Sequence, residues 1–242
     1  FDPTDGTGQF TVALWAFWDG TGTFQHFLSK SNGWGADTMM FQFELWGAHT
    51  NTAYTDRVGV SYQPAGSIAF SIMPKNEWVH LALMFDKSNA VIYLNGVDKE
   101  GPKPFSIGPN VNAMVEIGYT STRPTLSERT FHGSLDDVRI YSRVLTAKEI
   151  QQLMIGIPPG AAFNPSPADE ATDVPREVVL SWTPGIFAPP VNGHKVYLSD
   201  NFVDVNDGIG GITQDANSYA PPQRLNLGTT YYWRVDEVNG PP

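Results

Sequence analysis

The stretch that decides the fold is Phe131-His-Gly-Ser-Leu-Asp-Asp-Val-Arg-Ile-Tyr-Ser-Arg-Val-Leu-Thr-Ala-Lys-Glu-Ile150. Its first half reads as a strand, in which Val138 and Ile140 share one face and are expected to point into a core. Its second half contains Thr146-Ala-Lys-Glu149, which has the spacing of a capping box at the start of a helix. An apolar stripe follows from Ile150 onward. The sequence therefore predicts a strand that leads into a short helix.

Strand patterns fill the sequence ahead of this stretch. Apolar residues alternate or run continuously, as in strands covered on one or both faces, over Phe10–Trp18, Met39–Leu45, Trp78–Phe85 and Ala90–Leu94. The pair Asn95-Gly96 follows the last of these. It is the strongest short hairpin signal, because a type I′ turn needs positive φ at both central positions. The fold class predicted from these patterns is all-β.

The composition favours a protein with a real core and many turns. Of 242 residues, 41% are hydrophobic, and 23 glycines and 19 prolines suit short strands joined by turns. The formal net charge of -10 argues against nucleic acid or an anionic lipid surface as a partner, since both attract clustered Lys and Arg. The same acidity is compatible with calcium and with neutral sugars.

Cysteine is absent, which excludes disulfides, thiol catalysis and zinc–thiolate sites together. No apolar run reaches the ~18 residues of a membrane span, so no membrane insertion is expected. No signal peptide is seen. The chain begins at Phe1, and we therefore expect it to be processed or cut from a longer protein.

A second domain is predicted after a change in composition. Gly156-Ile-Pro-Pro-Gly160 ends the helix and marks the boundary between a first domain, residues 1–157, and a second domain, residues 161–242. Short strands are expected at Glu177–Trp182, Gly193–Leu198 and Thr230–Val235. Their spacing and their aromatic residues suit a small β-sandwich.

Residues 10–154 resemble the laminin-G-like, or concanavalin-A-like, jelly rolls of bacterial surface proteins. The segments that carry the resemblance are Phe10–Trp15, Glu77–Ala82, Val91–Val97 and, above all, Phe131–Ile150. The resemblance implies a jelly-roll sandwich with lectin-like function. The family usually has a further strand and a Gly/Asp-rich loop ahead of the position of the first residue, and these are missing.

Residues 163–240 resemble a fibronectin type III module, an immunoglobulin-like sandwich smaller than the first domain. The resemblance rests on Pro165–Asp169, Leu180–Trp182 and Leu225–Tyr231, the last of which is similar to a tyrosine-corner segment. The module is expected to lack its final strand. The pair of domains resembles modular extracellular proteins of planctomycete-type bacteria, which implies a secreted or cell-surface location. An open sheet edge could also be filled by a strand from a neighbouring chain.

The residues argue against an enzyme. Glycosidases need two carboxylates at ~5–9.5 Å, which on a strand must sit at i, i+2 or i+4 to share a face. Glu44 has no such companion in its strand, and Asp136 and Asp137 are adjacent and should point to opposite faces. The five histidines lack metalloprotease spacing, and no nucleophile elbow or phosphate loop is present. We therefore expect no catalytic residues.

Asp136 is the main candidate ligand for a structural calcium ion. It shares strand parity with Val138 and Ile140, so it should face the core, where a carboxylate needs a partner. The family resemblance implies a calcium ion near this strand, completed by the N-terminal loop, in which Asp2 and Asp5 are the nearest carboxylates. Calcium takes six to eight oxygen ligands, so backbone carbonyls would have to add several. The alternative is a structural Asp bonded to backbone amides.

Recognition of a sugar needs an exposed aromatic ring beside polar side chains. The best candidate is the loop Lys30–Asp37, in which Trp34 stands between two glycines with Asn32 and Asp37 beside it. Other loop residues that pair aromatic and polar groups are Trp46, His49, Tyr119 and Arg123. The alternative for Trp34 is a lid folded onto the core. The tryptophans within strands, Trp15, Trp78, Trp182 and Trp233, are expected in the core.

Together these features predict a non-catalytic extracellular carbohydrate-binding module carried on a spacer domain. Its partner would be a glycan or polysaccharide. One alternative is a structural or adhesive surface protein that contacts neighbouring surface-protein chains. Another is the accessory region of a larger glycan-degrading enzyme. Assigning the spacer role to the second domain rests on fold-level analogy.

Overall fold

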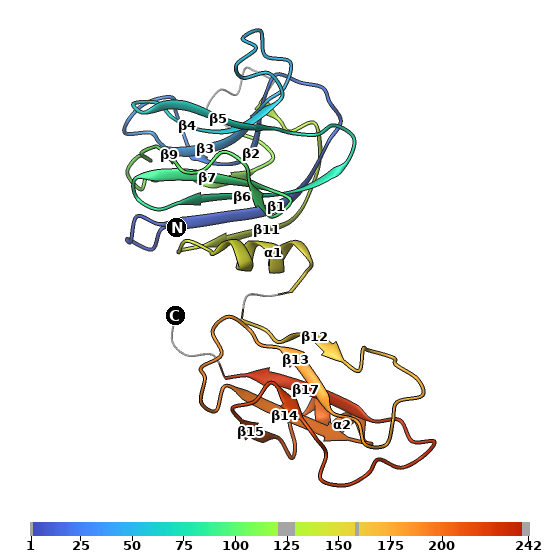
Figure 1. Ribbon diagram of the computed structural model, residues 1–242. Coiled ribbons are helices and arrows are strands. Elements are labelled where there is room, and N and C mark those ends of the chain that lie inside the picture. The colour runs from blue at the N-terminus through green and yellow to red at the C-terminus, as the bar shows by residue number, and fades with distance from the viewer. Residues whose placement is uncertain (1, 121–128, 158–159, 239–242) are drawn as a thin grey trace. The chain divides into compact units, whose positions relative to one another are not determined.

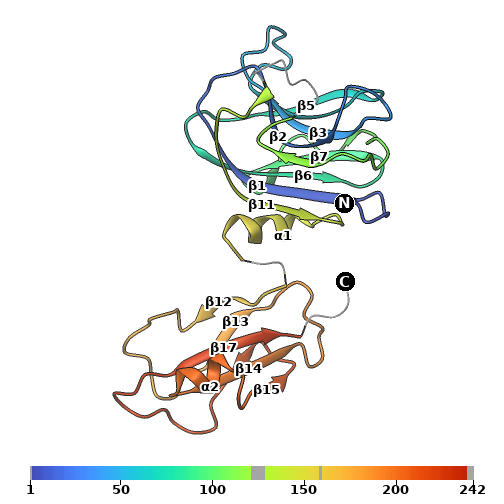
Figure 2. The ribbon, with the colours of Figure 1, turned by 180° about the vertical axis from the view of Figure 1, so that it is seen from behind.

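The computed structural model describes residues 2–120, 129–157 and 160–238 (Figures 1 and 2). The chain divides into two compact units, Phe1–Met154 and Ile155–Pro242, and the predicted linker begins just after this division. Both units are built from antiparallel sheets, which confirms the all-β fold class. In the described parts of the chain, no helix has the length and apolar character needed to cross a membrane.

The first unit is a sandwich of two antiparallel sheets. The six-stranded sheet has the order β11 (Gly133–Tyr141), β1 (Phe10–Trp18), β6 (Trp78–Phe85), β7 (Asn89–Leu94) and β8 (Val97–Asp98), with β9 (Lys103–Pro104) also paired to β7. The five-stranded sheet has the order β10 (Val115–Ile117), β2 (Phe24–Ser31), β3 (Met39–Trp46), β4 (Arg57–Tyr62) and β5 (Gly66–Ile72). The chain passes from one sheet to the other several times, as in a jelly roll.

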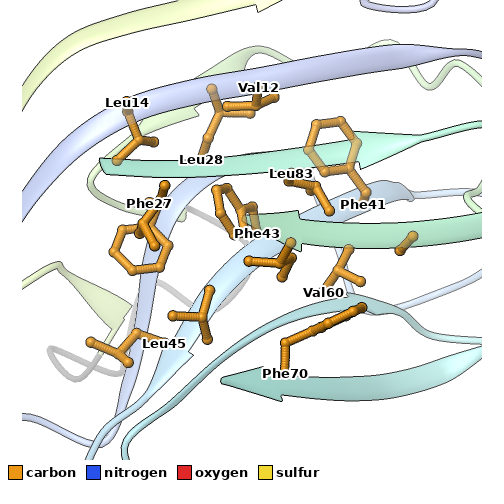
Figure 3. Packing of buried hydrophobic residues seen from close by; sticks show 14 of the residues in the cluster. Val12, Leu14, Phe27, Leu28, Phe41, Phe43, Leu45, Val60, Phe70 and Leu83 are labelled. Atoms are coloured by element: carbon orange, nitrogen blue, oxygen red, sulfur yellow. The ribbon is translucent and has the colours of Figure 1, made fainter. Parts of the chain in front are cut away.

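The core lies between the two sheets and is formed by alternate residues of their strands (Figure 3). On β3, Phe41, Phe43 and Leu45 face inward and are fully buried. The Phe41 ring lies 4.7 Å from that of Phe10, and the Phe43 ring lies 5.0 Å from that of Phe27. Aromatic pairs at these distances stabilise a core beyond the apolar area that they bury.

The predicted helix is α1 (Ala147–Met154), and it packs on the outer face of the six-stranded sheet. The capping box is present: the amide of Thr146 donates to Glu149 Oε2 over 2.6 Å, and the amide of Glu149 donates to Thr146 Oγ1 over 3.3 Å. Ile150 and Leu153 pack with Ala13 of β1 in a second, smaller apolar cluster. One half of this outer face is therefore buried under the helix.

A β-bulge in β11 overturns the predicted orientation of Asp136. Pairing with β1 joins Ala13 to Arg139 and then Trp15 to Asp136, which leaves an extra residue on β11. Asp137 has a φ of +48°, and the strand irregularity lies there. Leu135 and Val138 consequently both pack against the core, although three positions separate them, whereas Asp136 is exposed on the outer face. The prediction of a buried Asp136 was wrong because the sequence does not reveal the bulge.

The second unit contains two three-stranded sheets. One has the order β12 (Phe163–Ser166), β13 (Leu180–Thr183), β16 (Ser218–Tyr219), and the other β15 (Ile212–Gln214), β14 (His194–Ser199), β17 (Tyr232–Glu237). A short helix, α2 (Phe202–Asn206), follows β14. Trp182 is buried, as predicted. The Tyr231 hydroxyl accepts a hydrogen bond from the Asn226 amide over 3.2 Å, which is the contact expected of a tyrosine corner. Membership of the fibronectin type III family stays a prediction.

Candidate functional site

The predicted sugar-binding residues lie at opposite ends of the first unit. Trp34 is in the loop that joins β2 to β3, whereas His49 lies just beyond the far end of β3. Seven residue steps separate the first and last residues of β3, which is about 23 Å at ~3.3 Å per residue. One sugar ring cannot contact both loops, so these residues do not form a single site.

The β2–β3 loop, residues 32–38, presents Trp34 to solvent. The Trp34 side chain is 43% exposed and is not part of the core clusters, which excludes the alternative of a lid over the core. Asn32 and Asp37 beside it are also exposed. A Cβ atom on Gly33 would lie 2.8 Å from Thr38 Oγ1, so a larger residue there would displace the Thr38 side chain. One loop therefore carries an exposed aromatic ring, an exposed amide and an exposed carboxylate, and their role in binding a sugar stays a prediction.

Hydrogen bonds from neighbouring segments hold this loop in place. The amide of Asn32 donates to the Thr38 carbonyl over 2.8 Å, and the Asn32 side chain donates to the Asn112 carbonyl over 3.3 Å. The Tyr62 hydroxyl, at the end of β4, donates to the Ala36 carbonyl over 3.4 Å. We call the surface formed by Asn32, Trp34, Asp37, Tyr62 and Asn112 the loop surface. It is shaped before any ligand binds.

Trp46 and His49 have structural roles at the other end of the unit. Trp46 is only 3% exposed, because its ring lies across β4 where Gly59 has no side chain; a Cβ atom there would lie 1.9 Å from the ring. Tyr54 packs edge-on against Trp46 at 5.2 Å. His49 accepts a hydrogen bond from the Asn51 amide over 3.0 Å and contacts Phe24 edge-on. The prediction that Trp46 is available to stack on a ligand was wrong, because Gly59 opens a place for the ring on the sheet.

The last two predicted residues are Tyr119 and Arg123. Tyr119 is half-buried beyond the end of β10, and its carbonyl accepts a hydrogen bond from Ser29 Oγ over 3.4 Å. Arg123 lies outside the described residues.

The predicted calcium ligands are not brought together. Asp2 accepts hydrogen bonds from the amide and hydroxyl of Thr4, over 2.9 and 2.7 Å. Asp5 is exposed, and Asp136 is exposed on β11, where it accepts from the next amide. Residues 2–120, 129–157 and 160–238 contain no group of three or more His, Asp or Glu side chains that could hold a metal ion. Calcium therefore stays a prediction without a defined ligand set.

A buried polar network, which sequence reasoning missed, lies on the outer face of the five-stranded sheet. It consists of His26, Gln42, Glu44, Ser61 and Arg129, all of them buried. Cross-strand pairing places His26 opposite Glu44 and Gln42 opposite Ser61. Ser61 Oγ donates to Glu44 Oε1, and His26 Nε2 lies 3.4 Å from Glu44 Oε2. The polar network thus links three adjacent strands beneath Arg129.

Burial dominates the electrostatics of this network. It raises the pKa of Glu44 from 4.5 to about 7, against the opposing effects of the Ser61 hydrogen bond and the Arg129 charge. Burial also lowers the pKa of His26 from 6.5 to about 4. Both side chains therefore favour their neutral forms. His26 Nδ1 lies 3.3 Å from the Arg129 carbonyl, and Nε2 lies 3.1 Å from Gln42 Oε1. The ring of neutral His26 donates through only one of these two nitrogens.

The polar network does not have the geometry of a glycosidase site. The only other carboxylate on the five strands of this sheet is Glu116, on β10. By register it lies two strands across and two residues along from Glu44, which is roughly 12 Å and beyond the ~5–9.5 Å that glycosidases use. The side chains are also sealed from solvent. The network links the strands of the sheet that carries the loop surface.

A second set of aromatic side chains lies on the outer face of the six-stranded sheet. Trp78 is 47% exposed, and Trp15 and Phe17 are half-buried. The prediction that Trp78 lies in the core was wrong, because its strand neighbour Val79 faces the core instead. Trp78 and Val79 point to opposite faces of their strand. Both faces are apolar in sequence, so the alternation does not tell which of the two residues faces the core.

Comparison with known proteins identifies the fold. No curated protein matches the sequence. A candidate carbohydrate-binding protein from Bacteroides ovatus is similar, with 21% identity and a TM-score of 0.51 over 64% of this chain, and the match spans 43% of that protein. Domain 4 of AbnA, a GH43 extracellular arabinanase from Geobacillus stearothermophilus, solved with arabinotriose, matches with 24% identity and a TM-score of 0.44. That match covers 63% of this chain and 69% of the other.

A SAP-like pentraxin from Limulus polyphemus also matches, with 15% identity and a TM-score of 0.43, over 61% of this chain and 70% of that one. The family model described as the concanavalin A-like lectin/glucanases superfamily matches residues 2–151, which confirms the predicted laminin-G-like jelly roll. The match covers the whole two-sheet sandwich and α1 up to the middle of the helix. The chain belongs to the concanavalin A-like lectin/glucanase superfamily.

Proposed function

We propose that the first unit is a non-catalytic carbohydrate-binding module that stacks a sugar ring on Trp34. The observation that carries the proposal is the exposure of the Trp34 ring in a short loop in which the polar residues Asn32 and Asp37 are also exposed. An aromatic face offers apolar contact to a sugar ring, while the amide and the carboxylate are suited to its hydroxyls. The loop surface is held by hydrogen bonds, so little conformational entropy is lost when a ligand binds.

The carboxylates on the strands of the five-stranded sheet support the proposal of binding over catalysis. The superfamily, by its description, contains both lectins and glucanases. On the strands of the five-stranded sheet, Glu44 and Glu116 are too far apart for glycosidase chemistry, and Glu44 is buried. The similarity in fold to a candidate carbohydrate-binding protein from Bacteroides ovatus agrees with a binding role. We further propose that the module acts outside the cell and that the second unit serves as a spacer.

Affinity gel electrophoresis on a panel of soluble polysaccharides tests the proposal. Wild-type protein is expected to be retarded by at least one neutral polysaccharide, and Trp34→Ala is expected to bind it at least tenfold more weakly, a loss of ~1.4 kcal/mol. Phe202→Ala is the matched control, because Phe202 is an exposed aromatic residue of the second unit. Its retardation and the melting temperatures of both variants should match the wild type.

The same gels run with calcium and with chelator test whether the ion contributes to binding. Equal retardation of wild type and Trp34→Ala by every polysaccharide that binds would overturn the Trp34 site. A folded wild-type protein that binds none of them would overturn the carbohydrate-binding function. In that case a structural or adhesive role, with protein neighbours as partners, becomes the better account.

A further inference from the structure

Beside α1, the outer face of the six-stranded sheet carries aromatic side chains on which no helix or strand packs among the described residues. The helix α1 packs over Ala13 and Ala82, whereas the neighbouring part of the same face carries Trp15, Phe17, Trp78 and His80. Figures 1 and 2 show α1 along one side of β1 and β11. We call these four residues the sheet-face patch.

The sheet-face patch is organised as two cross-strand pairs. Register places Trp15 opposite His80 and Phe17 opposite Trp78 on β1 and β6. The Trp15 and His80 rings meet edge-on at 5.4 Å, and the Phe17 and Trp78 rings lie 5.9 Å apart with 58° between their planes. His80 is 2% exposed, and its Nδ1 has no hydrogen-bond partner within the described parts of the chain. The inner ring pair therefore supports the outer one, in which Trp78 is the exposed member.

A polar rim borders the patch on the edge strand β11. The same register places Ser134 opposite Phe17 and Asp136 opposite Trp15, and both rim residues are exposed. The neighbouring Asp137 forms an ion pair with Arg139 over 2.7 Å, so these two charges balance each other. The remaining charge of the rim is the negative charge of Asp136. By register, both rim residues lie two strands, about 10 Å, from the exposed Trp78, on the far side of Phe17 and Trp15. A carboxylate and a hydroxyl at this position can accept and donate hydrogen bonds to a neutral polyol.

We propose that the sheet-face patch is a second glycan-binding site, in which a neutral polysaccharide crosses the three strands: one ring stacks on Trp78, and Asp136 and Ser134 bind hydroxyls of the next ring. The proposal shares its ligand class with the Trp34 site but rests on different residues. The negative rim and the net charge of -10 disfavour an anionic polysaccharide.

The small size of the patch selects a sugar over a protein partner. It spans three strands, about 10 Å across, and two residue steps, about 7 Å along, so with side chains its area is on the order of 200 Å². A stable protein interface needs roughly 800 Å² on each partner. One or two sugar rings fit this area, whereas a second copy of the chain would find too little surface.

The two sites are too far apart to share one ring. Phe10 contacts Phe41 at the end of the sandwich where β3 leaves the 32–38 loop, and Phe17 pairs with Trp78 at the other end of β1. Seven residue steps along β1 correspond to about 23 Å. The first unit would thus hold two segments of a long polysaccharide, or two polysaccharide chains. Two linked contacts strengthen binding to a polymer by far more than binding to a short oligosaccharide.

The test uses the full chain and four variants: Trp34→Ala, Trp78→Ala, the double variant and the control Phe202→Ala. The probes are xylan, arabinan, galactomannan and mixed-linkage β-glucan, with polygalacturonate as the anionic counterpart. Calorimetry with a short oligosaccharide of the best-bound polymer should give two sites for wild type and control, one for each single variant and none for the double variant. Affinity for the polymer should fall at least about tenfold in each single variant.

The outcomes separate the two proposals. Wild-type stoichiometry and affinity in Trp78→Ala would overturn the second site and leave the first intact. If Trp78→Ala loses all binding while Trp34→Ala binds as the wild type does, the Trp34 site is overturned and the second site remains. Stronger binding to polygalacturonate than to any neutral polymer would refute the ligand class. A dimer in wild type that Trp78→Ala converts to a monomer would make the patch an interface between copies instead. Asp136→Ala, which alters an exposed side chain, repeats the test if Trp78→Ala fails to fold.

Discussion

Glu44→Gln is expected to stabilise the protein at alkaline pH. Glu44 is buried, and its pKa is raised from 4.5 to about 7 because burial disfavours the carboxylate. Below pH 4.5 both the folded and unfolded states carry the proton, so Glu44 costs nothing. Between pH 4.5 and about 7 the unfolded state releases the proton while the folded state keeps it, so the free energy of unfolding falls by about 3 kcal/mol in total. Above about pH 7 both states are ionised and the loss stays constant. Glutamine has the shape of the protonated side chain and never ionises, so this cost disappears.

His26 makes the expected pH profile unusual. Its pKa is lowered from 6.5 to about 4, so its contribution runs the other way: stability is lost as the pH falls from 6.5 through 4. Between about pH 4.5 and 6.5 the folded state holds the Glu44 proton and the unfolded state holds the His26 proton. The two terms cancel, and the contribution of this pair to wild-type stability is flat in that range. In Glu44→Gln only the His26 term remains, so stability should rise by up to about 3 kcal/mol over the same range.

Urea unfolding followed by tryptophan fluorescence between pH 4.5 and 8 measures this difference. The variant should match the wild type near pH 4.5 and exceed it at pH 8. Glu177→Gln, which changes an exposed carboxylate of the second unit, should leave the first unit's profile unchanged. A Glu44→Gln protein less stable than wild type at pH 8 would refute the reasoning. It would mean that Glu44 is ionised and paired with a charged His26, since removing one partner of a buried ion pair destabilises the fold.

Three further substitutions test the packing. Phe43→Ala should destabilise the first unit by ~3–5 kcal/mol in urea unfolding, because it leaves a cavity in the centre of the core; a loss below 1 kcal/mol would contradict that placement. Gly59→Ala should lower the melting temperature and shift the tryptophan emission to longer wavelength, since the new methyl group takes the place of the Trp46 ring. Unchanged emission would argue against this contact. Tyr231→Phe should cost ~1 kcal/mol in the second unit's unfolding alone, through loss of the Asn226 hydrogen bond; no change would remove the tyrosine corner from the account.

Local sequence patterns predicted most of the first unit. Strands with period two, the Asn95-Gly96 turn and the capping box at Thr146 are short-range features, and the structure has all of them. The loop position of Trp34 was also predictable, because the glycines on both sides of it disfavour a regular strand, whereas its exposure was left open beside a lid on the core. These predictions succeed because each depends on residues only a few positions apart.

The errors arose where the outcome depends on register between strands. Asp136 changed face because of a bulge whose partner residues lie on β1, more than a hundred residues away in sequence. Trp46 is buried because Gly59 happens to be its neighbour across the sheet. Glu44 lacks a carboxylate companion along its own strand, and its partners His26 and Ser61 come from β2 and β4. No spacing within one strand reveals such pairs.

The most direct test of the central claim is a titration of the protein with an oligosaccharide of the best-bound polymer, followed through the indole N–H resonances of its seven tryptophans. The resonances are assigned by single substitutions. The account predicts that the Trp34 signal moves with saturation, that the Trp78 signal moves as the second site fills, and that those of buried Trp18 and Trp46 stay in place. Shifts confined to tryptophans of the second unit, or a Trp34 signal that does not move while the oligosaccharide binds, would contradict it.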